Sequence, residues 1–214
     1  MASIIKLARI NSAGMNGMVL KMGASALKTK LEEQELNIDW EDYNYPYGLR
    51  LIHYMPMELK DKEKILVANI MHIAFLTIIP FYLLNCLTNL MAFIYMDPDI
   101  TVLMPIYSLF HLLIALPIGM AVFSRGYRAL AGISDERTYY KFGEIFMMVF
   151  MAIAFTFQLL CYHGIRTIMR FKEKVNGLVF TFGLIEEGIL LGQIILRAYC
   201  LYVTIYKYPP PKSE

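Results

Sequence analysis

Residues 65–95 read ILVANIMHIAFLTIIPFYLLNCLTNLMAFIY and contain no aspartate, glutamate, lysine or arginine. A helix of about 20 residues crosses a hydrocarbon layer about 30 Å thick, so this stretch is long enough to span a membrane. A helix of a soluble bundle keeps one polar face towards water, whereas this stretch is apolar on all sides. The sequence therefore predicts a transmembrane helix here.

Three further apolar stretches follow, at residues 101–123, 145–162 and 177–206. We therefore expect an all-α membrane protein with four transmembrane helices and short interfacial or cytosolic helices before them. The predicted spans lie near residues 66–95, 101–123, 144–163 and 184–206. They form a bundle over residues 65–206, after a basic arm and interfacial cap at 1–64 and before a tail at 207–214.

Composition narrows the function classes. Charged residues make up 18% of the chain, below the roughly 25% typical of soluble domains, and the net charge of +2 gives no bulk attraction to nucleic acid. The cysteines lie singly within apolar stretches, and no zinc signature, phosphate loop or nucleophile–base set is present. We expect no enzyme activity, no catalytic residue, no metal and no cofactor, with bound phospholipid as the one small molecule suggested.

The N-terminal region carries an early excess of basic residues. Residues 1–31 contain five lysines or arginines and no acid, which fits a membrane-surface segment, a mitochondrial address or a mobile arm. Residues 26–36 are typical of a short solvated helix, and residues 37–50 mix acids with aromatic rings that favour the headgroup layer. We interpret this region as a cap on the cytosolic face.

Basic residues near the span ends indicate the orientation. Most of them lie on the side shared by both chain ends and the second connector, residues 124–144, which places both termini inside. The second outer loop opposes this rule, since it holds Arg166, Arg170, Lys172 and Lys174.

Small and amide side chains predict how the helices pack. Asn85 and Asn89 share one helix face and should point at other helices, since an amide facing lipid is costly. Two small-residue pairs should allow close helix contact, Ala115 with Gly119 and Gly188 with Gly192. Pro80 is the expected kink of the first span. His72 and His111 lie at different depths, so we expect core histidines rather than haem ligands.

The fourth stretch contains the charged groups with the strongest claim to a role. Glu186, Gln193 and Arg197 fall on one helical stripe, and Glu187 adjoins them. Ionisable groups inside a membrane suggest proton or ion handling. Alternatively, residues 177–184 form a re-entrant segment, the glutamates sit at the bilayer edge beside Arg166 or Lys174, and Arg197 reaches towards the interface. We favour this alternative.

The second connector combines bases and tyrosines beside a membrane, which suits contact with anionic lipid or with partner proteins. Ordinary positive-inside anchoring explains the same pattern. The candidate contact residues are Arg125, Tyr127, Arg128, Arg137 and Lys141.

Two motif groups carry a family resemblance. Before the first span stand, in order, Trp40, Asn44-Tyr45-Pro46 and Met55-Pro56-Met57-Glu58. Around the second connector stand Pro117, Arg125, Tyr127-Arg128-Ala129-Leu130 and Ser134-Asp135. From Trp40 onward the chain thus resembles the secretory carrier membrane proteins, a family of four-span proteins of Golgi, endosomal and secretory membranes. In that family the segment matching the second connector is implicated in phosphoinositide binding and a late step of membrane fusion.

We therefore expect a non-enzymatic protein of vesicle trafficking in Golgi, endosomal or secretory vesicle membranes. Its expected partners are membrane lipids and other membrane protein subunits. The alternative is an accessory structural subunit of a large complex, such as the respiratory chain or ATP synthase of the mitochondrial inner membrane. The acid-free basic N-terminus and the missing Asn-Pro-Phe repeats of the resembled family favour that alternative. A small channel or carrier built on Glu186 and Glu187 is a third hypothesis.

Overall fold

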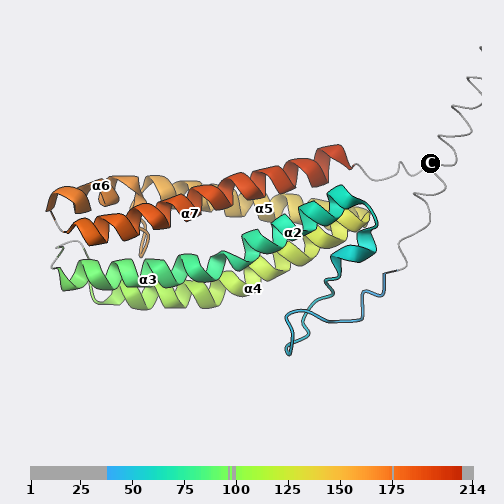
Figure 1. Ribbon diagram of the computed structural model, residues 1–214, viewed down its shortest axis with the longest axis horizontal. Coiled ribbons are helices and arrows are strands. Elements are labelled where there is room, and N and C mark those ends of the chain that lie inside the picture. The colour runs from blue at the N-terminus through green and yellow to red at the C-terminus, as the bar shows by residue number, and fades with distance from the viewer. Residues whose placement is uncertain (1–37, 96, 98–99, 175, 209–214) are drawn as a thin grey trace, which may run out of the picture. The chain divides into compact units, whose positions relative to one another are not determined.

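The computed structural model describes residues 38–95, 97, 100–174 and 176–208. Within this part of the chain, four helical segments are long and apolar enough to cross a membrane, which confirms the predicted fold class. They are Lys62–Ile94, Leu103–Ala131, Ser134–Thr156 and Gly177–Lys207. In Figure 1, α3 and α4 run side by side, and α6 and α7 lie across from them. The predicted arm at 1–31, the helix at 26–36 and residues 209–214 lie outside the described residues.

The first span consists of α2 (Lys62–Leu76) and α3 (Ile78–Ile94), interrupted at Thr77. Asp61 fixes its start, because the carboxylate accepts from the backbone N–H of Glu63 at 2.8 Å. The interruption comes three residues before Pro80, since a proline has no N–H and crowds the carbonyl one turn earlier. The helix therefore begins slightly earlier than the predicted span, and it is interrupted three residues before Pro80, the expected kink.

The second span, α4 (Leu103–Ala131), continues well past the predicted end at residue 123. It stops at Gly132, whose φ of +110° suits glycine, and the N–H groups of Gly132 and Ile133 bond to carbonyls of the last turn. Because α5 (Ser134–Thr156) starts directly afterwards, residues 124–144 are mostly helix. The connector predicted over residues 124–144 is therefore helical apart from the turn at Gly132 and Ile133.

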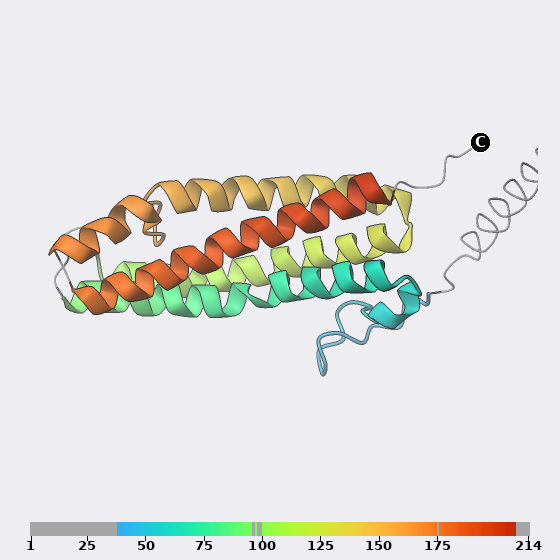
Figure 2. The same ribbon diagram turned by 45° about the horizontal axis from the view of Figure 1, so that its top comes forward.

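The third span is a broken helix. α5 ends at Thr156, residues 157–163 are not helical, and α6 (Gly164–Lys174) then continues towards the same end of the bundle. Figures 1 and 2 show the interruption as a short loop beside the junction of α5 and α6. The helix α5 therefore begins ten residues before the predicted span at 144–163 and ends seven residues before its predicted end, and the basic residues assigned to an outer loop lie on α6.

The fourth span begins at Gly177, not near residue 184. α7 (Gly177–Tyr202) is capped by Asn176, whose side chain accepts from the N–H of Leu178 at 2.7 Å, and a π-helical turn, η2 (Val203–Lys207), follows. The predicted re-entrant segment is thus the first part of a continuous helix. As a consequence, Glu186 and Glu187 lie in the helix interior, about three turns from its start.

The chain from Trp40 onward forms one compact unit. The start of the first span and the end of the fourth lie together, because Lys207 pairs with Glu63, as the predicted topology requires. We call this the basic end of the bundle, and the opposite end the far end. A short 3₁₀ helix, η1 (Pro56–Leu59), and the segment before it pack there, with the Tyr127 hydroxyl donating to the Met55 carbonyl at 2.7 Å. The cap therefore belongs to the compact unit, and a boundary at residue 64 would divide it.

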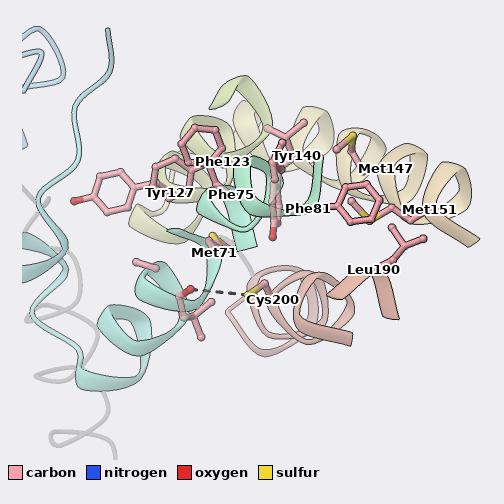
Figure 3. Close-up of a cluster of buried hydrophobic side chains, with 14 of the residues drawn as sticks. Met71, Phe75, Phe81, Phe123, Tyr127, Tyr140, Met147, Met151, Leu190 and Cys200 are labelled. Atoms are coloured by element: carbon pink, nitrogen blue, oxygen red, sulfur yellow. Dashed lines mark hydrogen bonds between the residues drawn. The ribbon is translucent and has the colours of Figure 1, made fainter. Parts of the chain in front are cut away.

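Close contacts of α4 with α5 and with α3 depend on glycines. A Cβ at Gly126 would lie 2.6 Å from a ring carbon of Tyr140, and one at Gly119 would lie 2.5 Å from Ile78. Figure 3 shows Phe123 and Tyr127 packed with Phe75 in this region. Ala115 also packs against the core, so the first small-residue pair is confirmed.

The second pair, Gly188 with Gly192, makes no close helix contact within the described part of this chain. A Cβ at Gly188 or Gly192 would meet no heavy atom within 4 Å among the described residues. Gly183 takes the packing role on α7 instead, because a Cβ there would lie 2.3 Å from Ile168 of α6.

These distances predict opposite effects for two matched substitutions. Gly126→Ala should lower the free energy of unfolding by about 1–3 kcal/mol, because the buried Tyr140 ring must move. Gly188→Ala should leave it unchanged or raise it by roughly 0.5–1 kcal/mol, because alanine favours helix and meets open space. Denaturant unfolding in detergent micelles, followed by circular dichroism, measures both. Equal effects of the two substitutions would contradict this packing.

Candidate functional site

Two groups of polar residues are candidates for function: the surface of the basic end and a cluster buried beside the broken third span. At the basic end, the structure divides the five predicted contact residues. Tyr127 is fully buried, and its hydroxyl is occupied by the Met55 carbonyl. Arg137 is buried as well, and its guanidinium donates to the carbonyls of Ile205 and Tyr208. These two residues fasten the cap and the end of the fourth span rather than face lipid.

The other three residues remain at the surface. Lys141 and Arg125 are exposed, and the Arg125 guanidinium lies 4.6 Å from the centre of the Tyr139 ring. Arg128 lies 5.4 Å from the Trp40 ring and 3.4 Å from the Glu136 carboxylate. Cation–π contacts of this kind hold a guanidinium in place without neutralising its charge.

Arg125 and Arg128 border a groove of about 300 Å³ on the outer side of α4. Its walls include Pro117, Met120 and Ala121, which lie one to three turns deeper along the same helix. The groove therefore joins an apolar floor to two guanidinium groups, with Glu136 as its acidic member. That combination suits an amphipathic anion.

The buried cluster gathers around the interruption of the third span. Asn85 donates to the Cys161 carbonyl at 3.0 Å and to Glu186 Oε1 at 2.6 Å, and Asn89 donates to the same carbonyl at 2.8 Å. Ser108 of α4 donates to Asn85 Oδ1 at 2.6 Å. The prediction that both asparagines face other helices is confirmed.

Both glutamates belong to this cluster, whereas the prediction paired them with Arg166 or Lys174. His163 Nδ1 lies 3.2 Å from Glu186 Oε2, and Glu187 accepts from the backbone N–H of Gly164. Both carboxylates are at most 4% exposed. The expected partner Arg166 is exposed instead, and the side chain of Lys174 lies outside the described side chains.

Arg197 also differs from its prediction. Its side chain is buried and donates to Glu144 of α5 at 2.9 Å, with 3% of the arginine exposed. Gln193, one turn away, is equally buried, and its Nε2 has no hydrogen-bond partner among the described residues. Glu144, the acidic partner of Arg197, lies at the edge of the predicted connector. The sequence pattern therefore did not single it out.

The remaining sequence candidates do not form a site together. His72 contacts the Tyr45 hydroxyl at 2.8 Å, whereas His111 contacts the Cys161 sulfur at 3.0 Å. Within the described residues, no group of three histidine, cysteine or acidic side chains is arranged to hold a metal ion. The cysteines there are all free thiols.

Reasoning from sequence missed His163, Ser108 and the Cys161 carbonyl. His163-Gly164 directly follows an apolar stretch and was available as a signal of interruption. Gly164 has a φ of +66°, and a Cβ there would lie 2.7 Å from the carbonyl carbon of Phe157, so the position requires glycine. Which side chains would meet the freed carbonyl depends on contacts between four different segments. Local patterns do not encode those contacts.

The cluster predicts a mainly structural role for Glu186. Glu186→Gln should lower the free energy of unfolding in detergent by about 1–3 kcal/mol, because it replaces a carboxylate facing His163 and Asn85. Glu173→Gln, at an exposed glutamate of α6, is the matched control and should have no effect.

The same proteins in liposomes test the carrier hypothesis. We expect proton flux at the background of protein-free liposomes for the wild type and for both variants. A flux above background that Glu186→Gln abolishes would contradict the structural role and favour a carrier.

The described contacts thus give two candidate sites with different chemistry. The groove at the basic end is open and positively charged, whereas the cluster of Asn85, Glu186 and His163 is closed and mostly satisfied by its own members. Comparison of the chain with protein-family models, curated proteins and solved structures finds no match.

Proposed function

We propose that this membrane protein acts without catalysis in vesicle trafficking, gathering anionic phospholipids and partner proteins at its basic end. The observation that carries the proposal is the groove in which Arg125 and Arg128 stand above Pro117 and Met120. An anionic phospholipid has the same two parts in the same order, a charged headgroup above hydrocarbon. The compartment we propose is the Golgi, endosomal or secretory vesicle membrane.

The charges of the groove favour phosphate recognition. Arginine offers a planar set of N–H donors that matches phosphate oxygens, and each basic residue near an anionic surface contributes about 1 kcal/mol. Tyr139 and Trp40 hold the two guanidiniums from the side, so ordering them on binding costs less. Glu136 lies 3.4 Å from Arg128 and leaves Arg125 as the more available cation.

The family resemblance supports the same surface. The motif residues Pro117, Arg125 and Arg128 line this groove together, although eleven positions separate the first from the last. The motif residue Trp40 contacts Arg128 from the cap. Motifs that lie apart in the sequence thus converge on one feature of the surface.

Removing both guanidiniums tests lipid recognition. Arg125→Gln with Arg128→Gln should weaken binding of a soluble phosphoinositide to the protein in neutral nanodiscs by roughly 25-fold, at about 1 kcal/mol for each base. Lys60→Gln with Lys62→Gln removes the same charge from exposed positions at the basic end and should have little effect. If the two double variants weaken binding equally, the basic residues act only as anchors.

Location tests the trafficking role. An epitope inserted beside exposed Tyr47 avoids both chain ends, and immunofluorescence should place the protein on Golgi or endosomal membranes. Co-purification in mild detergent should then recover vesicle proteins. Location in the mitochondrial inner membrane, with recovery of a respiratory or ATP synthase complex, would overturn the proposal in favour of an accessory subunit.

A further inference from the structure

A cavity of about 310 Å³ lies inside the bundle between α3, α4, α5 and α7. Its lining is mostly hydrocarbon and aromatic, and Figure 3 shows four of its side chains, Phe81, Met147, Met151 and Leu190, grouped together. The volume falls within the range of ligand pockets, and a water molecule in an apolar space has few partners. The cavity therefore suits a hydrocarbon occupant.

The mouth of the cavity faces the lipid side of the bundle. Ile114 and Ile118 of α4 and Phe146 of α5 line it and are 48%, 42% and 64% exposed. In a helix that crosses a membrane, side chains exposed at this position contact acyl chains. Lipid hydrocarbon is thus the molecule that adjoins the opening.

The mouth and the basic groove lie on one helical stripe. Ile114, Ile118, Ala121 and Arg125 follow at intervals of four, three and four residues, which places them on the same face of α4. Arg125 is seven residues, about 10 Å, from Ile118. The headgroup layer is about 5–8 Å thick on each side of the bilayer, so a lipid whose phosphate meets Arg125 has its upper acyl chain near Ile118.

Inside the cavity, one donor lacks an acceptor. Gln193 is 2% exposed and lines the cavity, and its Nε2 has no partner among the described residues. It lies one turn, about 6 Å, deeper than Arg197, which pairs with Glu144. The ester carbonyl of a glycerophospholipid is an acceptor that a lipid entering the cavity would bring to this donor.

We propose that this cavity holds one acyl chain of an anionic glycerophospholipid, with its phosphate at Arg125 and its ester carbonyl accepting a hydrogen bond from Gln193. The inference rests on the proposed function, since it assigns the chain and the ester of the lipid whose headgroup the groove attracts. The site selects a lipid from the surrounding leaflet by a charge outside the bundle and an enclosed apolar space within it.

A photoactivatable lipid tests the cavity. The full-length protein is placed in nanodiscs with phosphatidylserine that carries a diazirine midway along one acyl chain, and adducts are mapped by mass spectrometry. They should concentrate on peptides with Met147, Met151 and Ile114. Ala115→Phe fills the cavity from α4 and should reduce these adducts about tenfold. Ala152→Phe adds the same ring at an exposed position of α5 and should not reduce them.

A second variant removes the donor without adding volume. Gln193→Leu should abolish the preference for ester-linked over ether-linked phosphatidylserine in competition with the probe. It keeps the inference testable even if Ala115→Phe does not fold. Adducts spread evenly over exposed side chains, an equal response to the two phenylalanine substitutions, or no ester preference in the wild type would overturn the assignment.

Comparing lipid probes with different headgroups distinguishes the proposed function from the cavity site. Cavity adducts formed equally by a phosphatidylcholine probe, and unchanged by Arg125→Gln with Arg128→Gln, would overturn the anionic groove and with it the anionic part of this assignment. Loss of soluble phosphoinositide binding in that double variant, together with evenly spread adducts, would leave the groove standing and overturn the cavity site.

Discussion

The hydrogen bonds from Asn85 and Asn89 to the Cys161 carbonyl are the interaction on which the bundle depends most. A carbonyl freed by a helix break has no water to bond to inside a hydrocarbon layer, and leaving it unpaired costs several kcal/mol. Two amides from α3 meet this oxygen, and Ser108 fixes the Asn85 amide from α4. The interrupted segment is thereby tied to α3 directly and to α4 through Asn85.

The glutamates extend the same arrangement to the fourth span. Glu186 accepts from Asn85 and faces His163, while Glu187 accepts from Gly164 at the start of α6. One carboxyl group is thus placed beside an imidazole, and the other beside the N-terminus of α6. This explains why two acidic side chains occupy the interior of a membrane-spanning helix.

The basic end is organised by a different principle. Arginines at this end divide into buried ones that close the fold, such as Arg137, and surface ones held against aromatic rings, such as Arg125 and Arg128. The aromatic cap adds rigidity, since Tyr45 and Tyr54 pack around His72, and burial raises the pKa of Tyr54 to about 12. A protonated Tyr54 hydroxyl keeps its hydrogen bond to Asn69 at any physiological pH. The surface arginines are therefore held by a rigid aromatic cap at the basic end.

Uncharged length along the chain was enough to predict four crossings, and the pairing of Glu63 with Lys207 agrees with an even number of them. The length of an uncharged stretch predicts a crossing because a single segment in hydrocarbon can pair its own backbone groups only as a helix. The i, i+4 spacing of Asn85 and Asn89 predicted their inward face for the same reason.

Hydropathy could not reveal where the spans begin and end. Arg128 continues a helix as readily as it ends one, and residues 157–163 are apolar enough to resemble a span although they interrupt it. Nor did spacing identify the partners of Glu186 and Arg197, which come from positions 23 to 101 residues away. Only the folded bundle brings those side chains together, because the cost of leaving a polar group unpaired in hydrocarbon is met by whichever segment lies beside it.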